Sequence, residues 1–368
     1  MLIVWIFLGS GLLYLIQRGI FQHFWGKGLR LRVRFGSFAV TEGDAVTLTE
    51  RVENRKWLPL PMLHYQYILS RNFAGVTETG AKPILLRRRL ALPGRRAAVN
   101  RATLRGLPRG LYTLIEAKFG SSDLFFTGKW EQRETCIARL TVYPAKIPAE
   151  KLSLPFRLLL GSILTRRMAQ EDPFQLKGIR PYEIYDPLRT VNWKATARTG
   201  ELKVNQFEYS TDEALVFLPD MGSGSEEARE EVLRLASSLS QLFLRRGVSV
   251  SLWSNGRSCV TGSPIRVPPG SGIGHQNAVD EALAQIKLTA SVTAPIEDFL
   301  RALPPSVTVR ALPVVISADS SGAAAAACRE ALGPGGGYYV SVDGKTGVKK
   351  SGGVTVLSWD PAGEEVGA

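Results

Sequence analysis

The sequence predicts a multidomain chain with an N-terminal transmembrane helix, an antiparallel β-sandwich and an open α/β sheet. Three observations predict this organisation. The 368-residue chain begins with an uncharged apolar run. Short runs of alternating apolar and polar residues follow, which is typical of an antiparallel sandwich. From about residue 213 onward, strand-like and helix-like segments alternate, which is typical of a sheet with helices on its faces. A hydrophobic content of 45% is that of a globular protein.

The apolar run, residues 1–24, predicts a membrane anchor, since spanning a bilayer takes roughly 17–25 residues. No positive charge precedes the run and no small-residue cleavage site follows it, so we favour a retained anchor over a cleaved signal peptide or a buried helix. Five basic residues come before the first acidic one, Glu42, and they are Arg18, Lys27, Arg30, Arg32 and Arg34. The positive-inside rule therefore predicts a single-pass protein of the cell membrane, with the bulk of the chain in the cytoplasm.

Residues 28–147 are expected to form the sandwich, of immunoglobulin-like type. Alternating runs such as residues 45–52 and 140–143 are separated by turn signals, including Glu42-Gly43-Asp44 and Pro93-Gly94. Many short strands with regularly spaced turns are characteristic of that architecture.

The basic excess of the chain lies in this N-terminal part. Residues 1–150 contain 23 Lys and Arg against 10 Asp and Glu, whereas residues 151–368 contain 23 of each. A dense cationic stretch comprises Arg87, Arg88, Arg89, Arg95, Arg96, Arg101, Arg105 and Arg109. We expect this basic patch to meet anionic lipid head groups beside the anchor, with a plain solvated surface as the alternative. Nucleic acid is not expected as a partner, because no recognised binding motif or interleaved aromatic residue accompanies the charge.

Residues 148–212 contain the segment with the densest chemistry, Gly178 to Glu208. Asp186 followed by Pro187 predicts a helix N-cap and first turn, and Thr199-Gly200 predicts the end of that helix, about twelve residues later. Spacings of four place Arg189 with Trp193, and Lys194 with Arg198, so we expect Trp193 to pack inward and two cationic rows to face outward. Residues 201–209 are then expected to form a strand.

The final part, residues 213–368, alternates between strands and helices. Strands are expected at 214–218, 248–253 and 312–317, and helices at 226–246, 278–288 and 321–332. The glycine-rich residues 268–274 are expected to be a linker, and Asp319 is expected to cap the helix that follows it.

The crowded segment resembles the family known as domain of unknown function 58. The resemblance is carried by Arg180, Tyr182, Tyr185-Asp186, Arg189, Trp193-Lys194 and Ala197-Arg198-Thr199-Gly200. Tyr185 stands where the family usually has glycine, which implies a different turn before Asp186.

With this segment ahead of it, the final part resembles a von Willebrand factor A-like domain. The loop after the first strand of such domains normally holds magnesium through Asp-x-Ser-x-Ser. Asp220, Gly222 and Gly224 occupy these positions here, so both hydroxyl ligands are missing. We therefore expect no metal and no cofactor.

Recognisable enzymatic chemistry is absent from the sequence. His23, His64 and His275 lie in no catalytic motif, and no phosphate-binding loop is present. The three cysteines are far apart and odd in number, so neither a disulfide framework nor a zinc site is expected. We predict a protein that is not an enzyme, with hydrolysis of cell-envelope material as a remote alternative.

The resemblance implies association with a MoxR-type AAA+ ATPase, and hence a membrane-anchored scaffold or adaptor. The expected partner-binding residues are Arg180, Tyr182, Asp186, Arg189, Trp193, Lys194 and Arg198. The cations would meet an acidic partner, Tyr182 and Trp193 would anchor the contact, and Asp186 would cap the helix. An internal ion-pair network is the alternative role for Arg180, Asp186, Arg189 and Arg198, and a metal-dependent adhesion module is the alternative function.

Overall fold

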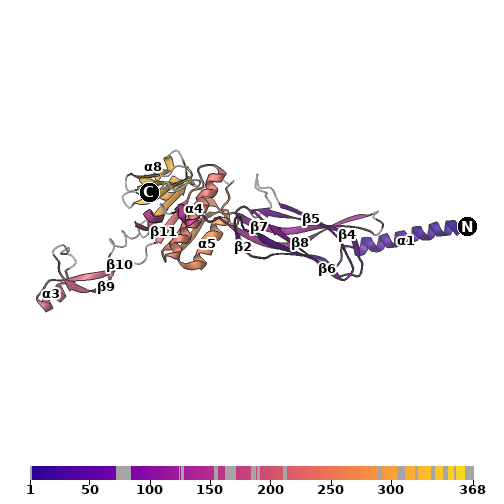
Figure 1. Cartoon of the computed structure of the whole chain (residues 1–368), viewed down its shortest axis with the longest axis horizontal. Coiled ribbons are helices and arrows are strands. Elements are labelled where there is room, and N and C mark those ends of the chain that lie inside the picture. Colours follow the sequence, from indigo (N-terminus) through magenta and orange to yellow (C-terminus); the bar gives the residue numbers. More distant parts are fainter. Residues whose placement is uncertain are drawn as a thin grey trace. The chain divides into compact units, whose positions relative to one another are not determined.

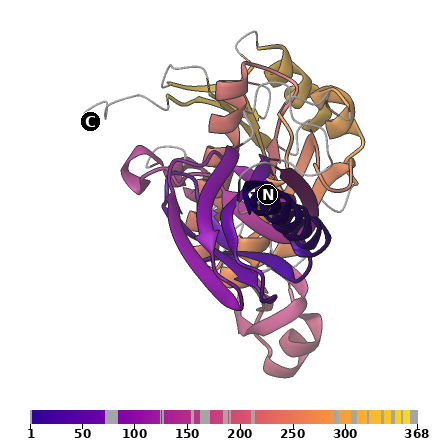
Figure 2. The ribbon, with the colours of Figure 1, turned by 90° about the vertical axis from the view of Figure 1, so that its right-hand side faces the viewer.

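The computed structural model describes residues 2–71, 84–123, 125, 128–152, 156–161, 171–183, 188, 191–209, 214–288, 292, 294–304, 311–319, 322–332, 336–342, 347–351 and 354–360. Its elements are shown along the chain in Figure 1 and from one end in Figure 2. The chain divides into two compact units. Unit 1 comprises residues 1–145, 257–263 and 280–290, and unit 2 comprises residues 146–256, 264–279 and 291–368.

Helix α1, Leu2–Phe24, opens unit 1. Its stretch Ile3–Phe24 is long and apolar enough to cross a membrane. Large apolar side chains along it are exposed, for example Trp5 at 70% and Phe7 at 73%. Its C-terminal end enters the core of unit 1, where Phe21 is fully buried, Ile20 is partly buried and Trp25 follows the helix. The N-terminal part of α1 therefore exposes apolar side chains, and its C-terminal end packs against the rest of unit 1.

Two sheets make up the rest of unit 1. The first has three antiparallel strands in the order β1 (Leu29–Phe35), β3 (Val46–Asn54) and β6 (Arg96–Leu104). The second has five strands in the order β2 (Ala39–Thr41), β8 (Lys129–Tyr143), β7 (Gly110–Ser122), β4 (Leu60–Arg71) and β5 (Ile84–Leu92). Neighbouring strands in these two sheets are antiparallel, except β2 and β8, which are parallel.

Both sheets contribute to one hydrophobic core. Alternate residues of β3 point inward, including Val46, Leu48 and Val52, and they join Leu63 and Leu114 of the five-stranded sheet. This alternation arises because successive side chains of a strand point to opposite faces. The expected strands at 45–52 and 140–143 are thus confirmed.

A carboxylate lies inside this core. Glu50 is fully buried and accepts hydrogen bonds from the hydroxyls of Tyr65 (2.7 Å) and Tyr67 and from the Asn100 amide (2.8 Å). The Arg88 Nε atom lies 3.7 Å from the same carboxylate. Burial raises the pKa of both tyrosines, so they remain protonated donors. The network joins strands of both sheets.

The expected basic patch is divided by this geometry. Arg87 and Arg89 on β5 are exposed, but Arg88 between them points inward toward Glu50. Arg109 is 1% exposed, and its guanidinium donates to the backbone oxygens of Leu283 (2.6 Å), Ala284 (3.3 Å) and Ile286 (3.0 Å). These carbonyls belong to the same compact unit. The expectation of a surface patch is therefore wrong for Arg109, whereas Arg88 remains partly exposed while it pairs with the buried Glu50.

Unit 2 is built on a seven-stranded sheet. The strand order is β13 (Pro264–Gly270), β12 (Ser249–Arg257), β11 (Ala214–Pro219), β14 (Ala311–Ser317), β15 (Gly337–Ser341), β17 (Val354–Ser358) and β16 (Gly347–Ser351). Five strands that are consecutive in the sheet, β12, β11, β14, β15 and β17, run parallel to one another. Strand β16 pairs antiparallel with β17. Strand β11 therefore lies between the next strand in the chain and a later one, so the direction of winding reverses there.

Helices cover both faces of this sheet. Phe217 contacts Phe243 of α4 (Glu226–Arg245), with ring centroids 6.3 Å apart. Val216 and Leu218 point the other way and share a core cluster with α6 (Ile296–Arg301) and α8 (Ala323–Leu332). The nearly continuous apolar run of β11 thus fits a strand that is covered on both sides.

Most of the expected elements of unit 2 are confirmed, including β11, α4, β14 and α8. Asp319 accepts from the Ala324 backbone N–H at 2.9 Å, as expected for a cap of α8. The linker prediction for residues 268–274 is wrong, because β13 runs to Gly270 and α5 (Gly272–Ala284) begins two residues later. Ile265 and Val267, just before that stretch, are buried, so apolar packing fixes the strand that continues to Gly270.

Candidate partner-binding site

The crowded segment forms a hairpin with a short helix between its strands. Strands β9 (Glu171–Pro181) and β10 (Lys203–Tyr209) pair antiparallel, and α3 (Trp193–Thr199) lies between them in the chain. The expected strand at 201–209 is confirmed by β10. The helix is shorter than expected and begins later.

Asn192, not Asp186, caps α3. Its side-chain oxygen accepts from the Ala195 backbone N–H at 2.9 Å, and its amide donates to Asn205 at 2.6 Å. Gly200 ends the helix at φ +72°, a conformation that glycine adopts without strain. Asp186 and Arg189 lie outside the described residues. The sequence favoured Asp186 because Asp-Pro is a strong start signal, whereas Asn192 is a cap of equal rank.

Backbone and side-chain hydrogen bonds hold α3 against the hairpin. The Lys203 backbone N–H donates to the Thr196 hydroxyl at 3.0 Å, and the Asn192 N–H donates to the Lys203 carbonyl at 2.8 Å. Val191 and Val204 are buried and form a bridge between the loop and β10. The hairpin therefore has an internal frame that does not depend on Trp193.

Trp193 is 66% exposed, and none of the residues of α3 is buried. The expectation that Trp193 packs inward is wrong, because the buried positions are taken by Val191 and Val204 on either side of the helix. Ile179, Leu188 and Leu202 are also exposed, at 48%, 66% and 43%. The described part of the hairpin thus displays large apolar side chains to solvent.

The predicted cations are placed differently from one another. Arg180 lies 3.9 Å from Glu183 and donates to the Pro181 carbonyl, and the adjacent Tyr182 is half-buried. Lys194 and Arg198 are exposed on α3, and neither has an ion pair among the described residues. Of the proposed internal network, Arg180 is paired with an acid that the sequence reasoning did not consider, and Arg198 points to solvent.

A second feature lies at the carboxyl ends of β11 and β14, where ligands often bind in open α/β sheets. Asp220 is fully buried there, and both of its carboxylate oxygens are already in hydrogen bonds. One oxygen accepts from the Asn255 amide (2.8 Å) and the Gly222 N–H (2.9 Å), and the other accepts from the Ser317 hydroxyl (2.8 Å). This carboxylate ties three elements together.

The two glycines after Asp220 are closely packed. A Cβ at Gly222 would lie 3.2 Å from the Asp220 Oδ1 atom, and a Cβ at Gly224 would lie 2.5 Å from the Ala318 Cβ. Gly224 also has φ +82°. Among the described residues, no group of three or more His, Cys, Asp or Glu side chains is arranged to hold a metal ion.

Residues 178–325 match the family described as protein of unknown function DUF58. The chain carries a DUF58 domain. A comparison with curated proteins finds no match.

Solved structures resemble the chain only distantly. One is the CARDB domain of a Pyrococcus furiosus protein in complex with di-metal ions, with 15% identity, a TM-score of 0.21, and coverage of 32% of this chain and 94% of that one. The sporulation control protein Spo0M of Bacillus subtilis has 12% identity, a TM-score of 0.20, and coverage of 42% and 58%. The C-terminal domain of Wzt has 9% identity, a TM-score of 0.24, and coverage of 32% and 75%. With TM-scores this low, these structures decide neither fold nor function.

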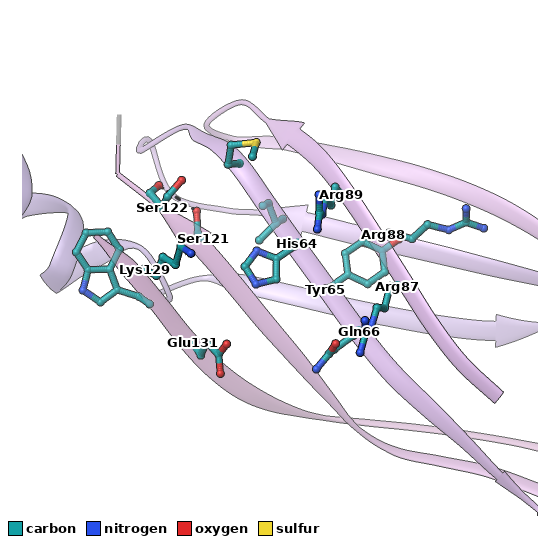
Figure 3. Close-up of a pocket in the computed structure, with 13 residues that line it drawn as sticks. His64, Tyr65, Gln66, Arg87, Arg88, Arg89, Ser121, Ser122, Lys129 and Glu131 are labelled. Carbon is teal, nitrogen blue, oxygen red and sulfur yellow. Dashed lines mark hydrogen bonds between the residues drawn. The ribbon is translucent and has the colours of Figure 1, made fainter. Parts of the chain in front are cut away.

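The DUF58 match begins inside β9 and ends inside α8, so it contains the exposed residues of α3 and the Asp220 loop. Most of unit 1 lies outside the DUF58 match. Unit 1 nevertheless contains a groove with a volume of about 520 Å³, lined by residues of β4, β5, β7 and β8 (Figure 3). The sequence reasoning did not find it, and the only available signal was the alternation of basic and apolar residues along these strands.

Proposed function

We propose that the chain is a membrane-anchored, non-enzymatic adaptor that binds a partner protein through the β9–α3–β10 hairpin. The observation that carries this proposal is the exposure of Trp193 beside Lys194 and Arg198, which are exposed and have no ion pair within the part of the chain that the structure describes. Tryptophan and arginine are enriched at the centres of protein interfaces, and a soluble protein seldom displays such side chains together without a use. The internal frame of the hairpin supports the same reading, because it holds α3 without help from these residues.

The partner we propose is a MoxR-type AAA+ ATPase or its cargo, on the strength of the family resemblance. Helix α1 would keep the adaptor at the cell membrane, with the bulk of the chain in the cytoplasm. We also infer that unit 1 is an immunoglobulin-like sandwich, which its two sheets around one core support. The parallel β11 to β17 sheet, with Asp220 after its first strand, supports a von Willebrand factor A-like fold for unit 2.

The metal-dependent adhesion alternative receives no support from the loop after β11. Both oxygens of Asp220 are engaged by protein donors, and the glycines leave no room for hydroxyl ligands without rearrangement. A magnesium ion needs several oxygen ligands in near-octahedral arrangement.

A crosslinked pull-down from native membranes tests the adaptor. The variant Lys194→Glu/Arg198→Glu reverses two exposed charges, and Trp193→Ser removes the exposed indole. The matched control is Arg101→Glu/Arg105→Glu, which makes the same change of charge at exposed positions in unit 1. We expect an AAA+ ATPase with the wild type and the control, and at least a tenfold loss with either hairpin variant.

Folding of each variant is checked by its thermal melting curve before the partners are compared. Recovery of the same partners with all variants would assign these side chains to some role other than binding. If no AAA+ ATPase accompanies the wild type, the proposed partner is wrong.

A further inference from the structure

The groove of unit 1 lies on the outer face of the five-stranded sheet, away from the hydrophobic core. Its central row is in strict register across four strands: Arg89 of β5 faces His64 of β4, His64 faces Gly120 of β7, and Gly120 faces Glu131 of β8. The adjoining pair on β7 and β8 is Ser122 with Lys129. Figure 3 shows His64 in the middle, with Arg89 on one side and Ser122, Lys129 and Glu131 on the other.

The floor of the groove depends on a missing side chain. A Cβ atom on Gly120 would lie 1.9 Å from the His64 Nε2 atom, so the imidazole lies directly over the glycine backbone. Any other residue at position 120 would push the ring outward. The lack of a side chain here therefore leaves space between Arg89 and Lys129. Their strands, β5 and β8, are three strand spacings apart in the sheet, which is about 14 Å. Side chains of this length, reaching from both sides, bracket a small anion.

The groove is cationic and has an unused donor. Arg87, Arg89 and Lys129 line it, against a single carboxylate, Glu131. None of these three cations has an ion pair among the residues that the structure describes. The Ser122 hydroxyl is buried and has no hydrogen-bond partner in the same part of the chain. Such a hydroxyl costs free energy unless a ligand or water completes it.

The groove also lies next to the end of α1. Trp130 lies between Lys129 and Glu131 on β8, and its ring packs on the core face of the sheet, 5.4 Å from the ring of Phe21, the buried residue in the last turns of the helix. Counted from Leu2, Phe21 is reached after about 30 Å of helix at 1.5 Å per residue, which equals the thickness of a bilayer's hydrocarbon core. Phe125, which is 56% exposed, makes a second aromatic contact with α1, because its ring lies 6.0 Å from the ring of Tyr14. If α1 spans the membrane, the groove opens into the head-group layer.

We propose that this groove binds the phosphodiester head group of an anionic phospholipid from the leaflet that holds the C-terminal end of α1. Arg89 and Lys129 pair with the phosphate oxygens, and the Ser122 hydroxyl donates a further hydrogen bond. Glu131 accepts from a hydroxyl of the head group. This inference rests on the membrane anchoring in the proposed function and is independent of the ATPase.

The site differs from a diffuse basic surface, because it places donors around one position instead of spreading charge. A diffuse surface loses affinity in proportion to the number of charges removed, wherever they are removed. A built site loses affinity only when its own residues change. This difference gives the test its control.

The experiment uses the full chain in nanodiscs of phosphatidylcholine with a fixed fraction of phosphatidylglycerol, and native mass spectrometry counts the anionic lipids retained. Wild type is compared with Arg89→Ala/Lys129→Ala and with Arg101→Ala/Arg105→Ala, which removes the same charge at exposed positions of unit 1 outside the groove. We expect the apparent dissociation constant for phosphatidylglycerol to rise at least tenfold in the groove variant and less than twofold in the control. Equal losses in the two variants, or no loss in either, would overturn the proposal.

Two further experiments distinguish a lipid head group from free phosphate and test membrane anchoring separately from lipid binding. Titration of the detergent-solubilised chain with inorganic phosphate is expected to give binding at least a hundredfold weaker than that of the lipid. Free phosphate that binds as tightly as the lipid would overturn the assignment to a head group. Flotation of the wild type with phosphatidylcholine vesicles reports α1 alone, so a chain that fails to float refutes the anchor, whereas a chain that floats without lipid selectivity refutes only this site.

Discussion

A buried arginine has a structural role in unit 1 where its sequence context indicated a surface role. Arg109 fans its guanidinium across three backbone oxygens near the end of α5, and burial keeps water from replacing it. Helix C-termini leave carbonyls without intrahelical donors, and a cation there also complements the helix dipole. The cationic stretch thus contains both exposed and fully buried arginines, and composition alone does not distinguish the two kinds.

Replacement of this arginine by an apolar residue is expected to be costly. Arg109→Met keeps much of the side-chain volume but removes the buried guanidinium that donates to the three carbonyls, so we expect about 3 kcal/mol of destabilisation. Arg109→Lys retains the charge and part of the hydrogen bonding, and we expect a smaller loss. Thermal or denaturant unfolding of the full chain measures both. If Arg109→Met melted at the wild-type temperature but bound lipid more weakly, Arg109 would contact the membrane surface and would not stabilise the fold.

Lys56 gives a prediction with a defined pH range. Burial lowers its pKa to about 8 from the usual 10.5, and its ammonium nitrogen is buried without a hydrogen-bond partner among the described residues. Below pH 8 the lysine is charged in both the folded and unfolded chains, and the folded chain bears the cost of burying that charge. Above pH 10.5 it is neutral in both, and the cost is gone. Native stability from this residue therefore rises between these values.

Lys56→Met is expected to stabilise the chain at pH 7 by about 1 kcal/mol, a value reduced for the partial exposure of the lysine. The advantage over wild type should shrink as the pH rises from 8 toward 10.5. Melting temperatures of both proteins in neutral detergent at several pH values give the comparison. A constant difference across this range would show that lost packing or altered solubility, not titration, separates the two proteins.

At the scale of elements, packing and hydrogen bonds fill the loop between β11 and α4. Asp220 accepts hydrogen bonds from Asn255, Gly222 and Ser317, and Gly224 allows the chain to pass against Ala318. Hydrogen bonds to a buried carboxylate satisfy it without metal. The resemblance to a von Willebrand factor A-like loop implied two missing hydroxyls at Gly222 and Gly224, but the sequence did not reveal how closely both positions are packed.

Restoring serine at these positions should therefore not restore a metal site. Gly224→Ser combines a positive φ with a clash against Ala318, so we expect about 2 kcal/mol or more of destabilisation. Gly222→Ser is the matched control, because Gly222 does not have a positive φ and the nearest atom to its added Cβ would be the Asp220 Oδ1 atom at 3.2 Å. Melting with and without millimolar magnesium distinguishes the outcomes. A magnesium-dependent rise in the melting temperature of Gly222→Ser would contradict the closed loop.

The elements that could be predicted were those with long, regular patterns. Strand β11 and helix α4 were located to within a residue, because an apolar run and an amphipathic repeat specify them locally. Helix α3 was misplaced because two start signals compete, and the choice of Asn192 depends on Asn205 and Lys203, which lie across the hairpin. The groove was not predictable, since Arg89, His64, Gly120 and Glu131 meet only through strand register.

At the scale of the whole molecule, the proposed anchoring through α1 would decide which compartment the rest of the chain occupies. Most of the large apolar side chains of α1 are exposed and are not covered by other residues that the structure describes, so a lipid environment would suit them. Basic residues on the domain side of α1 include Arg18, which donates to Tyr14, and Lys27, whose ammonium lies 5.0 Å from the Phe24 ring centre. Such residues favour the cytoplasmic side of a membrane.

Two arginines in the middle of α1 should release the chain from the membrane. Leu8→Arg/Leu12→Arg places two charges where each costs about 2.5–3.5 kcal/mol of insertion free energy, so we expect the variant to leave the carbonate-washed membrane fraction. Leu8→Ile/Leu12→Ile is the control and should remain. A C-terminal alkaline phosphatase fusion reports orientation, because the enzyme is active only outside the cytoplasm, and we expect it to be inactive while a green fluorescent protein fusion fluoresces. An active phosphatase would place both units, the exposed hairpin and the groove on the outer side, where a cytoplasmic ATPase has no access to Trp193.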